Sequence, residues 1–136
     1  QNYSLIPRIS ALDQILIPLD YAKVPRSEWI QRAKTYLDKV GLLDKIKSKP
    51  NEMSWGQNQR VSIARALASH PSIILADEPT WALDSKTWAE ILDLFEKIHS
   101  EWKTVIIITH DSWVAARAKR IIEIKDWEIV GDRRRE

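Results

Sequence analysis

Two adjacent carboxylates, Asp77 and Glu78, directly follow an unbroken apolar run, and Pro79 then interrupts the pattern. A short apolar run bounded by turn signals is typical of a strand buried on both faces, as in a parallel sheet. Open α/β sheets bind their ligands at the carboxyl ends of such strands. At that place Asp77 could coordinate Mg²⁺, and Glu78 could face a water molecule or a substrate. The alternative for an isolated Asp-Glu pair is a strand that ends in a solvated acidic turn.

Two further stretches carry side chains that could take part in catalysis or ligand binding. A second fully apolar run, Thr104 to Thr109, ends in His110 and Asp111. Ser54 and Gln57 have the spacing of a capping box, which begins a helix, and the free amides of such a helix form a site for an anion. The alternatives are an ordinary capped surface helix and a histidine with a structural role only.

The composition excludes several classes of protein. The 136 residues include 21 basic and 19 acidic side chains, so nothing demands a nucleic acid or an anionic membrane as partner. Cysteine is absent, which excludes disulfides. The longest apolar run, residues 105–108, is far too short to span a bilayer, and no signal peptide opens the chain. The chain begins at Gln1 rather than at a methionine, and we expect it to be a fragment.

The apolar periodicity predicts the elements that position these residues. Helices are expected near 11–17, from a Ser27 cap to Gly41 (with Ile30, Ala33, Leu37 and Val40 on one face), over 42–46, 54–69, 85–100 and 112–119, and strands over 72–76, 104–109, 120–125 and 128–130. Residues 132–136 are expected to form a solvated charged tail. Strands that alternate with helices favour a parallel α/β sheet.

Taken together, these pieces resemble the nucleotide-binding domain of ABC transporters. The matching stretches occur in the family's order: Gln1 to Leu5 (Q-loop), Met53 to Gln57 (signature motif), Ala76 to Thr80 (end of Walker B), Ala82 to Asp84 (D-loop) and Thr109 to Asp111 (switch histidine). The resemblance covers essentially the whole chain. If positions 81 and 88 are read as glycine, the run from Asp77 to Leu92 looks most like the macrolide-exporter and lipoprotein-release branch.

The resemblance implies a role for each residue. ATP and Mg²⁺ would lie between two such domains in a head-to-tail dimer, where the signature motif of one subunit contacts the γ-phosphate held by the other. Asp77 and Gln1 would hold the metal, Glu78 would be the general base, and His110 would contact the γ-phosphate and Glu78. The residues expected to bind the nucleotide are Gln1, Ser54, Trp55, Gly56, Gln57 and Asp84.

The fold that the resemblance implies is α/β, a P-loop NTPase (ABC ATPase) fragment. Residues 1–70 would form the Q-loop and the helical signature subdomain, 71–131 the C-terminal half of the RecA-like core, and 132–136 a charged tail. No Gly-x-x-x-x-Gly-Lys-Ser/Thr sequence occurs, so the P-loop that cradles phosphates is missing from these residues. We expect that this chain alone does not hydrolyse ATP.

The function that the resemblance implies is ATP hydrolysis that powers export or lipoprotein release. The partners would be a transmembrane permease and a second ATPase domain, with no nucleic acid, and the protein would sit in the cytoplasm against the inner face of the membrane. Two alternatives stay open. One is a non-transport ABC ATPase of the cell-division type, and the other is a catalytically degenerate module whose signature is disrupted by Trp55.

The chain has seven tryptophans and three glycines, whereas average usage predicts about nine or ten glycines. Several tryptophans stand where backbone geometry favours glycine: Trp127 in a hairpin turn, Trp102 just after a helix, and Trp55 in the signature stretch, where phosphate must approach the backbone. Trp81, before the D-loop, stands at a position that is commonly glycine in the relatives this chain resembles. Trp29, Trp88 and Trp113 are less diagnostic. The hypothesis is that most or all are misread glycines, as when UGA codons that mean glycine are translated as tryptophan. Deliberate mutagenesis and buried structural tryptophans, for which Trp29 is the candidate, are the alternatives.

Overall fold

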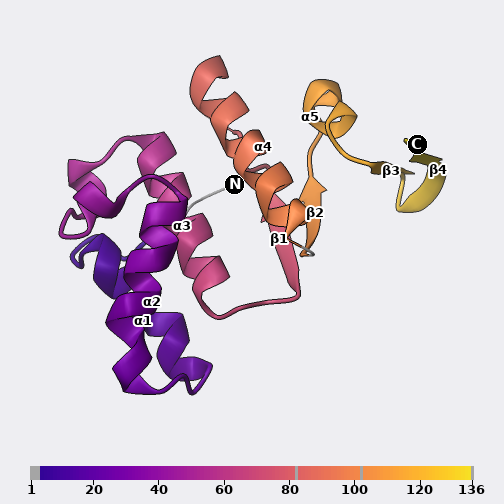
Figure 1. The fold of residues 1–136 in the computed structure, drawn as a ribbon. Coiled ribbons are helices and arrows are strands. Elements are labelled where there is room, and N and C mark those ends of the chain that lie inside the picture. Colours follow the sequence, from indigo (N-terminus) through magenta and orange to yellow (C-terminus); the bar gives the residue numbers. More distant parts are fainter. Residues whose placement is uncertain (1–3, 82, 102, 136) are drawn as a thin grey trace.

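The computed structural model describes residues 4–81, 83–101 and 103–135 of a mixed α/β chain. Its elements in chain order are α1 (Ala11–Tyr21), α2 (Arg26–Lys39), the 3₁₀ turns η1 (Leu43–Lys45) and η2 (Pro50–Glu52), α3 (Trp55–Ala68), β1 (Ile73–Asp77), α4 (Ser85–Ser100), β2 (Thr104–Ile108), α5 (Ser112–Ala116), β3 (Arg120–Lys125) and β4 (Glu128–Arg134). Helices α1, α2 and α3 pack on one another at one side, β1, β2 and α4 form the middle, and the β3–β4 hairpin lies at the far end (Figure 1).

Helix α1 packs through residues spaced four apart. Ala11, Ile15 and Leu19 are fully buried, and Ser10 caps the helix by accepting a hydrogen bond from the Asp13 amide at 3.1 Å. The helix continues through Pro18 to Tyr21, beyond the predicted end near residue 17. Proline lacks an amide proton but its φ is compatible with a helix. Burial of Leu19 in the next turn therefore keeps the helix going.

Helix α2 begins differently from the prediction. Pro25 precedes its first residue and no side chain caps it, so the expected Ser27 cap is wrong. Ile30 is 46% exposed and is not part of the packed face; Trp29 is the partly buried apolar residue of the first turn instead. The end of the helix was predicted correctly, since Gly41 adopts φ +73°, the left-handed conformation that glycine tolerates after a helix.

Strands β1 and β2 pair in parallel, with Asp77 opposite Ile108, as the sequence predicted. The expected burial of β1 on both faces is wrong. Ile74 and Ala76 pack into the core, but the other face of the two strands is exposed at Ile73, Leu75, Ile106 and Ile108. The described helices pack against one face only, so the period-2 alternation of a strand leaves every second apolar side chain uncovered.

The C-terminal part follows the predicted order with two adjustments. Helix α4 has the predicted bounds, and Ile91, Phe95 and Ile98 bury one side of it. Helix α5 ends at Ala116, earlier than predicted. Strand β4 continues to Arg134, so residues 132–134 belong to an antiparallel hairpin rather than to a free tail. In the described part of the chain, no helix combines the length and apolar character needed to cross a membrane.

Candidate active site at the ends of two parallel strands

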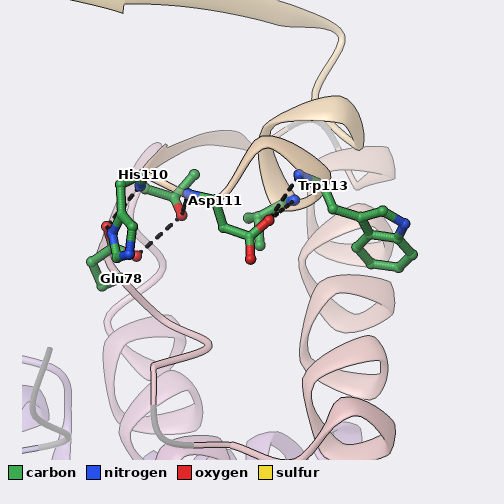
Figure 2. Close-up of polar contacts among 6 residues, drawn as sticks. Glu78, His110, Asp111 and Trp113 are labelled. Carbon is green, nitrogen blue, oxygen red and sulfur yellow. Dashed lines mark hydrogen bonds and ion pairs between the residues drawn. The ribbon is translucent and has the colours of Figure 1, made fainter.

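The carboxyl ends of β1 and β2 bring Glu78 and His110 together. Glu78 follows β1 directly, and its amide donates to the Ile108 carbonyl at 2.9 Å, which extends the strand pairing by one step. The backbone amide of His110 donates to Glu78 Oε1 at 2.8 Å, and His110 Nδ1 lies 2.6 Å from the same oxygen (Figure 2). Thr109 Oγ1 donates to Glu78 Oε2 at 3.1 Å. Three donors from one strand end therefore fix this carboxylate.

These contacts set the charge state of Glu78. Burial by itself raises the pKa of the carboxyl, but the hydrogen bonds from His110 and Thr109 outweigh burial and lower the pKa below its usual value. The Glu78 side chain is 11% exposed, whereas that of His110 is 83% exposed. The pair therefore presents an ionised, mostly covered carboxylate beneath a solvent-facing imidazole.

The backbone at Glu78 is also unusual. Its φ is +43°, in the left-handed region that residues with a Cβ rarely adopt. The chain then turns, because the Trp81 amide donates to the Glu78 carbonyl at 3.1 Å and the Leu83 amide to the Thr80 carbonyl at 3.2 Å. Uncommon backbone conformations concentrate at functional sites, where the surrounding structure enforces them. Here the strand pairing and the bonds to the carboxylate are what enforce it.

Asp77 is the last residue of β1 and its side chain is exposed, at the strand edge where Glu78 begins the turn. Among the described residues, no group of three His, Cys, Asp or Glu side chains is arranged to hold a metal ion. Magnesium is commonly held by one or two carboxylates together with water and substrate phosphates. The donor chemistry of Asp77 fits that mode of binding.

The residues expected to form the signature motif lie at the beginning of α3. The predicted capping box is present, with the Gln57 amide donating to Ser54 Oγ at 3.1 Å and the Ser54 amide donating to Gln57 Oε1 at 3.0 Å. Gly56 lies directly against Thr87 at the start of α4, so that a Cβ at position 56 would overlap the Thr87 methyl group. Trp55, the first residue of the helix, is 47% exposed.

Asp84 joins this region through Thr87. It caps α4 by accepting from the Lys86 amide at 3.1 Å and the Thr87 amide at 3.0 Å, and the Thr87 hydroxyl donates to it at 2.6 Å. The bonds from Thr87 hold the pKa of Asp84 below its usual range. The start of α3 and the cap of α4 thus meet at Thr87. Of the other predicted site residues, Gln1 lies outside the described residues.

Sequence reasoning missed two residues that hold the segment following Gln1. Gln14 is fully buried; it accepts from the Ile6 amide at 3.1 Å and donates to the Ile6 carbonyl at 2.6 Å. Arg65 of α3 donates to the Ser4 carbonyl at 3.0 Å. A glutamine next to a core isoleucine in an amphipathic helix was the available signal for Gln14. The sequence carries no comparable signal for Arg65, whose partner lies far away in the chain.

Comparison with known proteins places this geometry in a family context. Residues 1–81 match a family model described as ABC transporter. The chain is 51% identical to the uncharacterized ABC transporter ATP-binding protein YvrO of Bacillus subtilis, over 98% of the chain and 58% of that protein. It is 49% identical to the macrolide export ATP-binding/permease protein MacB of Aggregatibacter actinomycetemcomitans, over 97% of the chain and 20% of that protein.

Solved structures agree with these relatives. The chain superposes with a TM-score of 0.84 and 43% identity on a dimeric post-hydrolysis state of the ATP-binding cassette MJ0796 bound to ADP and Pi, covering 98% of this chain and 60% of that one. The chain thus spans about three fifths of YvrO and of the MJ0796 chain, and about one fifth of MacB.

Proposed function

This chain belongs to the ABC transporter family, and from that premise we propose that its full-length protein is the ATP-hydrolysing subunit of an exporter or lipoprotein-release system. Its fold is that of an ABC ATPase cassette, of which it is a part. The relatives named above include an ATP-binding/permease protein for macrolide export, and the matched cassette structure is a dimer. The partners we propose are accordingly a membrane permease and a second ATPase domain, with the protein on the cytoplasmic face of the membrane.

The observation that carries the proposal is that hydrogen bonds from Thr109 and His110, directly after β2, hold the Glu78 carboxylate in place. Hydrolysis requires a water molecule to lose a proton as it attacks the γ-phosphorus, while the bond from that phosphorus to the ADP oxygen breaks. Glu78 is the acceptor we assign for that proton. Its lowered pKa keeps it ionised near neutral pH, and the donors from Thr109 and His110 hold it in one orientation.

His110 has a second task in this proposal. Because an ionised Glu78 can only accept, Nδ1 of His110 must carry the proton in the 2.6 Å contact. The other ring nitrogen, Nε2, is then free to face a ligand. Contact with a phosphate oxygen needs a proton on Nε2 as well, so a histidine that bonds Glu78 and phosphate at once carries a positive charge. That charge would offset the one that develops on the phosphoryl group.

The remaining residues would bind ATP and Mg²⁺. Asp77 would supply a carboxylate for the metal, which when bound would neutralise charge on the phosphates of the nucleotide. Gln1 would be a further ligand. The amides of Ser54 and Gln57 bond each other's side chains in the capping box, so these two residues would order the start of α3 while the Gly56 amide is directed at the nucleotide of the partner subunit. Asp84 would lie at the same junction through its contact with Thr87, against which Gly56 also packs.

One observation favours a second candidate function, a cassette without catalysis. Trp55 places a half-exposed indole at the first residue of α3, where amides would have to approach phosphate. A chain with this residue could dock on its partners and fail to close on ATP. The activity of the full-length protein with tryptophan or with glycine at position 55 separates the two candidates.

The test of the proposed function is an ATPase assay on the full-length protein, alone and with its permease in lipid nanodiscs. We expect turnover that requires Mg²⁺ and that His110→Ala reduces about 10²-fold or more, since it removes a positioned group at the reacting centre. His99→Ala is the matched control, because His99 is an exposed histidine at the end of α4 that contacts only the Lys103 carbonyl among the bonds described. Equal activity of the two variants would contradict the role of His110.

A further inference from the structure

The tryptophans of this chain lie in unusual places. Six of the seven are in the described residues, and none belongs to the buried core, which is built from aliphatic side chains with Tyr36 and Phe95. Four of them are largely exposed: Trp55 at 47%, Trp81 at 58%, Trp113 at 50% and Trp127 at 99%. Tryptophan is highly buried on average, because its large apolar surface stabilises a core. The four exposed tryptophans are therefore not explained by packing in the core.

Trp127 is the clearest case. It is the second residue of the two-residue turn between β3 and β4, with Lys125 paired to Glu128. The φ angles of Asp126 and Trp127 are +50° and +66°. Positive φ at both central residues defines the type I′ hairpin turn, whose preferred sequences are Asn-Gly and Asp-Gly. A fully exposed indole gains nothing there to offset an unfavourable backbone, so the geometry is that of an Asp-Gly turn.

Trp55 and Trp81 stand at the two segments that carry the proposed chemistry. Trp55 adjoins Gly56, whose backbone is in direct contact with Thr87, so the start of α3 packs closely against the start of α4. Trp81 lies in the turn after Glu78, and its amide donates to the Glu78 carbonyl. The Trp55 side chain is 47% exposed and that of Trp81 is 58% exposed, so neither indole is part of the buried core. Glycine would preserve the amide and leave room for a ligand.

The other contacts of these residues give little support to tryptophan. Trp113 stacks on Trp88 with ring centroids 4.3 Å apart, and the Arg117 guanidinium lies 5.8 Å from the Trp113 ring centroid. Trp113 is 50% exposed in spite of both contacts. Figure 2 shows the Trp113 indole directed away from Glu78. Trp29 differs, because its Nε1 donates to the Val24 carbonyl at 2.9 Å and it packs against the core.

We propose that the native residue at positions 55, 81, 113 and 127 is glycine, and that these positions share a UGA codon which the source cell reads as glycine. With glycine at 55, the helix start reads Ser-Gly-Gly-Gln, and with glycine at 127 the hairpin turn reads Asp-Gly. Four such conversions would change the counts from seven tryptophans and three glycines to three tryptophans and seven glycines, which removes most of the imbalance. Trp29 stands outside the proposal on its contacts, and Trp102 lies outside the described residues.

The test reads the residue in protein made by the source cells. Trypsin should release residues 126–133, 48–60, 104–117 and 66–86, which carry positions 127, 55, 113 and 81 one by one, and residues 27–32, which carry position 29. Peptide masses that fit glycine at the four positions, over UGA codons in the gene, are the expected result. The codons of Gly41, Gly56 and Gly131 are the control and should be ordinary glycine codons.

Two results would overturn the proposal. The first is UGG at the four positions, which encodes tryptophan without any reassignment. The second is UGA with peptide masses that fit tryptophan, since the cell would then read that codon as tryptophan. In either case the exposed indoles would be native. The outcome is independent of the ATPase test, because it concerns residue identity and not turnover.

Discussion

Replacing Trp127 by glycine should stabilise the protein. A bulky residue in the left-handed region costs roughly 1–2 kcal/mol, and Trp127 is held there at φ +66°. Its side chain is 99% exposed, so removing it uncovers no core. Glycine gives back about 0.5–1 kcal/mol through its greater freedom in the unfolded chain. The net gain is about 0.5–1 kcal/mol, which raises Tm by about 1–4 °C in a protein of about 150–250 residues.

The assay is thermal unfolding of the full-length protein, followed by circular dichroism. Trp29→Gly is the matched control and should lower Tm, because glycine inside a helix costs about 1 kcal/mol and the bond to the Val24 carbonyl is lost. Both variants remove one indole, but the expected changes in Tm have opposite signs, so loss of an indole alone cannot explain both results. A lower Tm for Trp127→Gly would refute the reasoning, because it would mean that the indole stabilises the turn it occupies.

Three further predictions concern packing and charge. Gly56→Ala should lower Tm, because the added Cβ would overlap the Thr87 methyl group and overpacking costs about 1–3 kcal/mol. The better helix propensity of alanine offsets part of this cost. An unchanged Tm would show that the Thr87 side chain moves aside without a cost in stability. Gln14→Leu should lower the urea midpoint, because the amide and carbonyl of Ile6 lose their partner at a cost of about 1–3 kcal/mol; an unchanged midpoint would mean that water replaces the side chain. The pKa of Glu78 is lower in the folded protein than its usual value of 4.5, so the charged carboxylate stabilises the folded state. We therefore expect the free energy of unfolding of the wild type to exceed that of Glu78→Gln above pH 4.5, and this difference to disappear as pH falls through the lower folded-state pKa. A difference that does not change with pH in denaturant titrations would contradict this prediction.

Local signals predicted much of this fold. The Ser54–Gln57 capping box, the two parallel apolar strands and the turn at Asp126-Trp127 are set by residues close together in sequence, and the structure has all three. The meeting of Glu78 and His110 followed from the same logic, because parallel strands end at the same sheet edge. What the sequence supplied at the site was thus the placement of residues at strand and helix ends.

Tertiary effects account for the failures. Whether one or both faces of β1 are covered depends on which elements pack there, and the apolar run Ile73 to Ala76 looks the same in either case. The passage of α1 through Pro18 depends on the burial of Leu19 against other helices. The positive φ of Glu78 and the bond from Thr109 to its carboxylate were not predicted, and no local pattern encodes either of them.

The central claim is that Glu78, fixed by the end of β2, accepts the proton in ATP hydrolysis. Its most direct test measures ATP binding and single-turnover hydrolysis side by side for the full-length wild type and Glu78→Gln, with Glu123→Gln as a control at an exposed glutamate of β3. The account predicts that Glu78→Gln binds ATP with near wild-type affinity, hydrolyses it about 10²- to 10⁴-fold more slowly and accumulates as an ATP-bound dimer, while Glu123→Gln behaves as wild type. Hydrolysis by Glu78→Gln at close to the wild-type rate would contradict it.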